Sequence, residues 1–246
     1  MILAVAVAVI LINRPAPARD PDPSSLQASG RFGFPVSDIK IGEGGTKKAG
    51  DGKTVTGYAG TCDSAAQAAA NYTHLVEDVN VSTWAQQKNT LAEVGKSGPW
   101  TEKITFKGDL LTNSKDLPNG PFKGGWFSRT DVASGGLYRV ASCEAKKKAV
   151  VQVFFGAVSA NVKTAPSAFF QTATFELVWD GDWKISDAAI VANGQDFGGR
   201  VKDAGPMSVG TNLEDEAIPV LRDDLVNAFF KDISREGWVE YANAKR

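Results

Sequence analysis

The sequence is poor in the residues that build metal sites. Its 246 residues include only two cysteines, Cys62 and Cys143, and a single histidine, His74. Two cysteines exclude a four-cysteine zinc site, and one histidine leaves no second imidazole to share a metal ion. We therefore expect neither a metal nor a cofactor.

An excess of charge of one sign is also missing. The chain carries 27 basic and 28 acidic residues, a net charge of −1, so no long-range field attracts a nucleic acid. The one basic cluster, Lys146–Lys148, lies between two strand-like runs and is typical of a solvated hairpin turn. No nucleic-acid partner is expected.

A phosphate-binding loop is absent, although the segment IGEGGTKKAGDGKT contains a GKT ending at Thr54. A Walker loop has the form G-x-x-x-x-G-K-[ST] and follows a strand. Lys47 occupies the position of its first glycine, and no strand-like run precedes it. The segment is typical of a surface loop.

The sequence also lacks a set of catalytic residues. His74 has Asn, Thr and Glu neighbours, which favour the exposed flank of a helix over the position of a general base. Carboxylate pairs such as Asp180 and Asp182 fall at turns or helix starts, where acidic residues serve a structural purpose. No G-x-S-x-G nucleophile motif occurs. We expect no catalytic residue, and therefore a protein that is not an enzyme.

Long hydrophobic runs are limited to the first twelve residues, MILAVAVAVILI. A membrane-spanning helix needs about 20 apolar residues, and a signal peptide begins with basic residues that are missing here. A strand of the core is the alternative, but four prolines within residues 15–23 would separate it from the domain. We interpret residues 1–12 as part of a signal anchor whose earlier portion precedes this sequence. The expected location is the cell membrane, crossed once, with the domain outside the cytoplasm.

Residues 13–56 are rich in proline, glycine and polar side chains, and we expect a disordered tether there. Outside the cytoplasm, Cys62 and Cys143 could pair as one disulfide that closes a long loop. Two separate buried thiols are the alternative, because free cysteine packs as a small apolar side chain. Sequence alone leaves this choice open.

The pattern of residues 57–193 predicts an α+β domain. An alanine-rich helix begins near Cys62, with Thr61 or Asp63 as its cap, and a second helix covers 82–94. Apolar runs of strand length follow, and Asp180-Gly181 between two of them is a strong hairpin signal. The strands are expected at Leu137–Cys143, Ala149–Val158, Phe169–Asp180 and Trp183–Val191. An antiparallel meander of these strands would pack its apolar face on the N-terminal helices.

Residues 194–246 are expected to form a glycine-rich connection and an additional C-terminal helix, from about Leu213 to Ile233. Apolar residues recur along that helix at spacings of three and four, which gives it one apolar face. Packing on its own domain is the favoured interpretation of this face, and self-association is the alternative.

Three segments carry a resemblance to a known family: Gly57-Tyr58, Ala68 through Tyr72, and Leu177 through Lys184. Together they are similar to segments of uncharacterised membrane-anchored proteins of actinobacteria with a nuclear transport factor 2-like domain. The resemblance covers residues 57–191 and implies a cone-like fold. Such proteins resemble extracytoplasmic scaffold subunits of conjugative, type IV-like secretion systems, a family without agreed catalytic residues to carry over.

The favoured hypothesis is a membrane-tethered, non-catalytic scaffold or assembly domain, with protein partners or self-association, in an apparatus such as a conjugative DNA-transfer system. The alternative is a small-molecule-binding module, because a cone encloses a cavity between sheet and helix. A cavity with convergent polar groups would favour this alternative. An isomerase or dehydratase of the same fold is the third hypothesis and would need a buried acid or His74 facing the cavity with a perturbed pKa.

Overall fold

The computed structural model describes residues 26–27, 29–78, 83–112, 127–161, 164–190 and 218–246. The predicted anchor, residues 1–12, lies outside these ranges. Among the described residues, no helix has both the length and the apolar character needed to cross a membrane.

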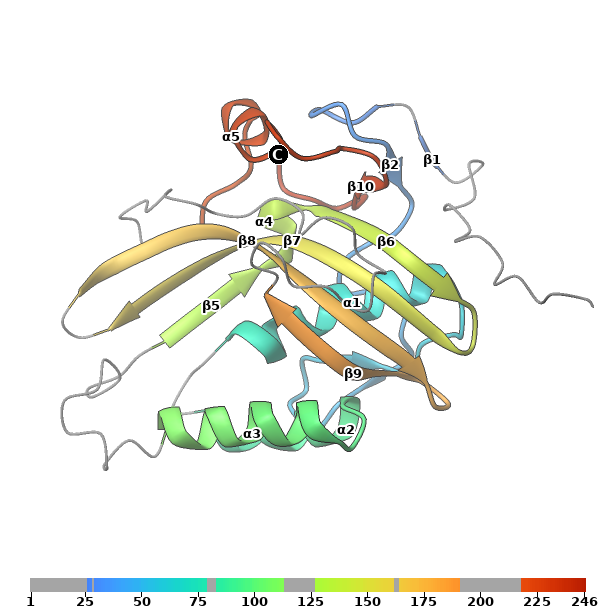
Figure 1. Cartoon of the computed structure of the whole chain (residues 1–246), viewed down its shortest axis with the longest axis vertical. Helices are drawn as coiled ribbons and strands as arrows, with labels where there is room; N and C mark the ends of the chain where they lie inside the picture. The colour runs from blue at the N-terminus through green and yellow to red at the C-terminus, as the bar shows by residue number, and fades with distance from the viewer. Residues whose placement is uncertain (1–25, 28, 79–82, 113–126, 162–163, 191–217) are drawn as a thin grey trace, which may run out of the picture.

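A mostly antiparallel sheet forms the centre of a mixed α+β fold (Figure 1). Its main part is a meander in which each strand pairs with the next along the chain. The four strands are β6 (Leu137–Glu144), β7 (Lys148–Asn161), β8 (Thr164–Trp179) and β9 (Trp183–Ile190). The expected strands and both expected turns are thereby confirmed.

The edge of β7 that β6 occupies is shared with a second strand, β5 (Phe127–Asp131). A short helix, α4 (Val132–Gly135), separates the two and is capped by Asp131, whose carboxylate accepts from the Ala133 N–H at 2.9 Å. A Cβ at Gly135 would lie 2.4 Å from the Phe154 carbonyl oxygen. This position therefore needs a glycine, because α4 packs directly on the backbone of β7.

Among the described residues, three helices precede β5: α1 (Cys62–Glu77), α2 (Trp84–Val94) and α3 (Pro99–Thr112). Helix α1 crosses one face of the sheet, and α2 and α3 lie side by side next to β9 (Figure 1). Five alanines of α1 are buried, and their small side chains let the helix approach the sheet closely. The two predicted helices are confirmed, whereas α3 was not predicted.

Each face of the sheet has its own apolar core, because side chains alternate along a strand. Val153 and Phe155 of β7 point to the face that α1 covers, and Phe154 points to the other. There, Phe154 packs with α5 (Asp223–Phe229) and with aromatic side chains such as Phe34. The sheet therefore lies between two layers (Figure 1).

Segments from the two ends of the sequence complete the sheet beside β6. Strand β10 (Trp238–Glu240) pairs antiparallel with β6 and parallel with β2 (Val36–Ser37), which in turn pairs with β1 (Leu26–Gln27). A separate hairpin joins β3 (Lys47–Lys48) to β4 (Val55–Thr56).

The prediction of a disordered tether over residues 13–56 is wrong for its described parts, residues 26–27 and 29–56. Phe32, Phe34, Ile39 and Val55 are buried there, spread over both cores. The alternation of Phe32 and Phe34 with Gly33 and Pro35 is too short to predict a strand, and glycines and lysines follow it. These side chains pack against surfaces that distant parts of the chain supply.

The predicted C-terminal helix is shorter than expected. Residues 213–217 lie outside the described ranges, and the helix begins only at Asp223 and ends at Phe229. Before it, the Leu221 N–H donates to the Ser134 carbonyl at 2.9 Å, so this segment is bonded to α4 instead of continuing a helix. The apolar face packs on its own domain, as favoured.

Candidate ligand-binding site

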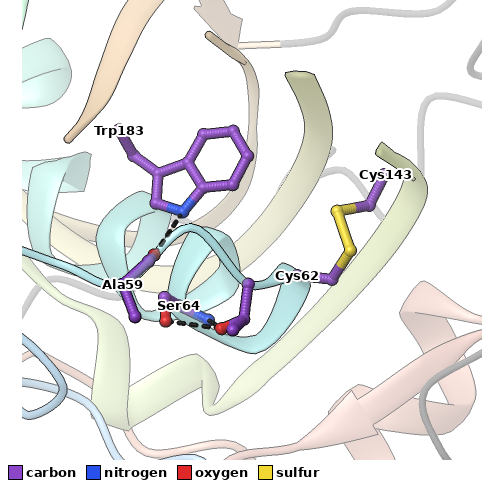
Figure 2. The surroundings of a disulfide bond; sticks show 6 residues. Ala59, Cys62, Ser64, Cys143 and Trp183 are labelled. Carbon is purple, nitrogen blue, oxygen red and sulfur yellow. Dashed lines mark hydrogen bonds between the residues drawn. A yellow bond between two sulfur atoms is a disulfide. The ribbon is translucent and has the colours of Figure 1, made fainter. Parts of the chain in front are cut away.

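The N-terminal end of α1 is fixed by several contacts. Cys62 and Cys143 form a disulfide that joins the first residue of α1 to β6 (Figure 2). Thr61 caps the helix by accepting from the Ser64 N–H at 3.2 Å. The preceding loop is held by the Trp183 indole, which donates to the Ala59 carbonyl at 3.1 Å.

Asp182, in the turn between β8 and β9, holds the same loop from the other side. Its carboxylate accepts from the backbone N–H groups of Gly57 at 2.6 Å, Tyr58 at 3.0 Å and Trp183 at 2.8 Å. The side chain is buried. A buried carboxylate that accepts from three backbone N–H groups serves the fold, because it fixes the loop before α1 against the β8–β9 turn.

His74 is half-buried instead of fully exposed. Its Nε2 lies 3.1 Å from the Thr54 hydroxyl and 3.8 Å from an Asp51 carboxylate oxygen, and Thr54 donates to Asp51 at 2.5 Å. Burial tends to raise the Asp51 pKa, but hydrogen bonds from His74, Thr54 and backbone amides outweigh it and hold that pKa well below its usual value.

This cluster resembles a catalytic triad only in composition. A triad uses the two ring nitrogens of the histidine separately, one facing the nucleophile and the other facing the acid. Here the same nitrogen, Nε2, faces both Thr54 and Asp51. Thr54 is also completely buried. The cluster joins the β3–β4 hairpin to the last turn of α1.

A cavity of about 740 Å³ lies between α3 and the edge strand β9, and the end of α1 closes one part of it. Its volume is within the range of about 300–1,000 Å³ that is usual for small-molecule sites. Its lining combines apolar, acidic and basic side chains from four elements. The lining residues are Val76, Glu77, Pro99, Trp100, Lys103, Ile104, Lys107, Glu176 and Ser186 through Ile190.

One face of α3 forms a wall of this cavity. Trp100, Lys103, Ile104 and Lys107 follow one another at spacings of three, one and three residues, which places them along a single helical face. The Trp100 indole donates to the Ala188 carbonyl at 2.9 Å and thereby holds α3 against β9. Pro99 is the first residue of α3, a position where proline is favourable because its missing N–H needs no partner.

The opposite wall comes from β9, where a bulge changes the pairing. Glu176 of β8 pairs with Asp187, but the next residue, Leu177, pairs with Ile185, so Ser186 is an extra residue. The Ser186 hydroxyl donates to the Glu176 carbonyl at 3.0 Å. Because a bulge re-aims the side chains that follow it, this irregularity helps to place Asp187 and its neighbours along the cavity.

Glu77 is the carboxyl group whose acidity is most altered in this cavity. Burial raises its pKa to about 7; the positive charge of Lys107 lowers it, and the negative charge of Asp78 raises it further. The neighbouring Asp78, whose carboxyl group is hydrogen-bonded to Thr130 of β5, also has its pKa raised by burial, to about 6. A carboxyl group with a pKa near neutrality can exchange a proton under physiological conditions.

None of the cavity residues was singled out as a site from the sequence. Cys62 and Cys143, the two that were, lie at the opposite end of α1 and are bonded to each other. The spacing from Pro99 to Lys107 is the one signal that could have shown a mixed apolar and basic helical face. Glu77 and Asp187 carry no such signal, because only the tertiary fold brings them to one cavity.

The described part of the chain contains no group of three or more His, Cys, Asp or Glu side chains arranged to hold a metal ion. Comparison with known proteins gives no relative: no family model, no curated protein and no solved structure matches this chain.

Proposed function

We propose that this protein is a membrane-tethered, extracytoplasmic binding module whose cavity between α3 and β9 holds a small molecule without transforming it. The observation that carries the proposal is the cavity of about 740 Å³, in which polar groups from α1, α3, β8 and β9 converge on an apolar surface. The cavity lies beside β9, the last strand of the meander, to which the Trp100 indole holds α3.

Two further features support the location and the fold class within this proposal. The Cys62–Cys143 disulfide is typical of proteins that fold outside the reducing cytoplasm. The packing of α1 on one face of an antiparallel meander is compatible with the nuclear transport factor 2-like cone that the sequence resembles. We retain that family as part of the proposal.

The test is a fragment screen by NMR on uniformly ¹⁵N-labelled protein. We expect neutral aromatic fragments to shift the indole N–H of Trp100 and the amides of Ala188–Ile190, and to leave the Trp238 indole on the opposite face unchanged. An Ala189→Phe variant should reduce binding, because the larger side chain occupies the cavity. An Ala242→Phe variant, at an exposed site outside the cavity, is the matched control.

The proposal would be wrong if no fragment shifts these signals, or if Ala189→Phe and the control bind equally well. Folding of both variants is checked by their thermal unfolding and by the dispersion of their amide signals.

An assembly role, such as a scaffold in a conjugative DNA-transfer apparatus, is the second candidate function. Phe106 is 70% exposed and Leu110 is 47% exposed, and they lie one turn apart on α3. We propose that this pair contacts a protein partner. A photo-crosslinking residue at Phe106 in membranes should yield a discrete product of defined mass, whereas one at the exposed Lys231 beside α5 should not. Identical patterns at both positions would contradict the proposal.

A further inference from the structure

The charged side chains of the cavity differ in sign between its walls. Lys103 and Lys107 belong to α3, whereas Glu77 belongs to α1, Glu176 to β8 and Asp187 to β9. Among the described residues, Lys103, Lys107, Glu77 and Asp187 form no ion pair with another charged group, although the positive charge of Lys107 lowers the Glu77 pKa. Two basic and three acidic side chains therefore face one cavity.

Apolar surface separates these charges. Trp100 and Ile104 of α3 lie between or next to the two lysines, and Val76, Ala188 and Ile190 supply the facing apolar groups. A ligand that fills this space needs an apolar body as well as charged groups. The cavity volume is sufficient for a molecule with an aromatic ring.

Addition of a peptide strand to the edge of β9 does not explain the cavity. The Ile185 carbonyl already accepts from the Lys96 N–H at 2.8 Å, and the Ala188 carbonyl accepts from Trp100. Strand addition needs a row of unpaired backbone groups, and this edge is occupied at both positions. A compact ligand recognised by side chains is the better fit.

From this arrangement, and resting on the proposed function, we infer that the ligand is a small zwitterion with an apolar side chain, of the chemical class of a free amino acid. Its carboxylate is bound by Lys103 and Lys107, and its ammonium group by Glu77 and Asp187. Its side chain packs on Trp100 and Ile104. Charge-assisted hydrogen bonds of this kind are the strong ones available in a half-buried cavity.

The test uses three molecules of one shape: L-phenylalanine, 3-phenylpropanoate, which lacks the ammonium group, and phenethylamine, which lacks the carboxylate. Binding is measured by calorimetry at pH 8, where most Glu77 side chains are ionised because their pKa is about 7. We expect phenylalanine to bind about tenfold more tightly than either analogue, since each analogue loses one charge-assisted contact.

Two variants test which wall of the cavity binds the ammonium group of the ligand and which binds its carboxylate. Glu77→Gln should weaken phenylalanine about tenfold and leave 3-phenylpropanoate unchanged, whereas Lys107→Gln should weaken both of these and leave phenethylamine unchanged. Glu102→Gln, an exposed position on α3 outside the cavity, is the matched control and should bind like the parent protein. Thermal unfolding shows whether each variant is folded.

The outcomes separate this inference from the proposed function. If neutral fragments bind in the cavity but phenylalanine binds no more tightly than phenethylamine and 3-phenylpropanoate, the zwitterion inference is wrong and the binding function stands. If neither the fragments nor the three molecules bind, both are wrong. Equal losses in Glu77→Gln and Lys107→Gln for all three molecules would also overturn the inference.

Discussion

The two ends of α1 lie 15 residues apart in one helix, yet their polar groups differ in how they affect the stability of the fold. At the first end, Thr61 caps the helix, Cys62 is bonded to β6, and Asp182 accepts three N–H groups of the adjoining segments. At the last end, Glu77 and Asp78 carry carboxyl groups whose pKa values are raised by burial. The contacts at the first end stabilise the fold, whereas ionisation of the carboxyl groups at the last end destabilises it.

Under the proposed function, this difference separates the part of the domain that stabilises the fold from the part that binds a ligand. Carboxyl groups that are buried without adequate partners destabilise a folded protein, and they persist at sites where they contact something else. The disulfide and the three amide hydrogen bonds of Asp182 lie at the end of α1 that is remote from the cavity. The cavity end is thereby free to keep unfavourable charges without unfolding.

The largest effect is expected at the fixed end, from removal of the disulfide. A Cys62→Ala, Cys143→Ala double variant should lose about 3 kcal/mol of unfolding free energy, because an open chain has more conformational freedom when unfolded. Urea denaturation measures this loss. A reductant should destabilise the parent protein by a similar amount and leave the double variant unchanged. Equal stability of variant and parent would show that the disulfide does not fix this end.

The next largest effect is expected for Asp182→Ala, which removes the acceptor of the Gly57, Tyr58 and Trp183 amides. We expect a loss of about 2 kcal/mol of unfolding free energy, because buried N–H groups are left without a partner. Asp182→Asn keeps the shape and one acceptor oxygen, so its loss should be smaller. Hydrogen exchange of the three amides shows whether they have lost their acceptor. Unchanged protection of these amides in Asp182→Ala would contradict this explanation.

At the end of α1 beside the cavity, a substitution is expected to raise the unfolding free energy instead of lowering it. The Glu77 pKa is about 7 in the folded protein, above the value of 4.5 for a free side chain, so ionisation opposes folding. This opposition is small near pH 4.5, grows as the pH rises toward 7, and is complete above pH 7. Glu77→Gln should therefore differ little from the parent at pH 4.5 and be more stable at pH 8 by about 1 kcal/mol, less than the full pKa shift corresponds to because the side chain is partly exposed.

The pH comparison must separate Glu77 from the charges around it, which are those of Lys103, Lys107, Asp78 and Asp187. Asp78→Asn should give a smaller stabilisation that develops at lower pH, because the Asp78 pKa is about 6. Urea denaturation at four pH values between 4.5 and 8 measures both. A Glu77→Gln variant that is less stable than the parent at pH 8 would show that its charge contributes favourably.

The smallest effect is expected for an exposed ion pair. Lys96 and Asp180 lie 2.9 Å apart, and more than half of each side chain is exposed. Water screens such a pair, so Lys96→Ala should leave the unfolding free energy unchanged within the error of denaturation. A clear loss would mean that the α2–α3 connection, whose backbone contacts β9 at Gly95, depends on this side chain.

The sequence predicted those parts of the fold that are determined by patterns of residues close together in the chain. Alternating apolar residues and the Asp180-Gly181 turn predicted the meander, and the alanine-rich segment predicted α1. Helix α3 was not predicted because Gly98 and Pro99 are typical of the end of a helix, although proline at the first position also begins one. The pattern of α3 is weak, since Phe106 and Leu110 are exposed and contribute nothing to a buried stripe.

The candidate site could not be predicted from the sequence, because its residues come from four elements that only the complete fold brings together. The position of Glu77 at a helix end and that of Asp187 in a strand carry no sequence pattern that indicates a site. Strand β10 was missed for a similar reason. Trp238–Glu240 is too short to show a period, and its place in the sheet depends on pairing with residues about 100 and 200 positions away.

That strand has a consequence for the order in which the domain can form. Because β10 lies between β2 and β6, the early segment around Phe34 can reach its place only after Trp238 has been synthesised. A chain emerging from a ribosome or an export channel can form the meander and α1 first. The layer around α5 then closes last and joins both ends of the described chain in a single late event.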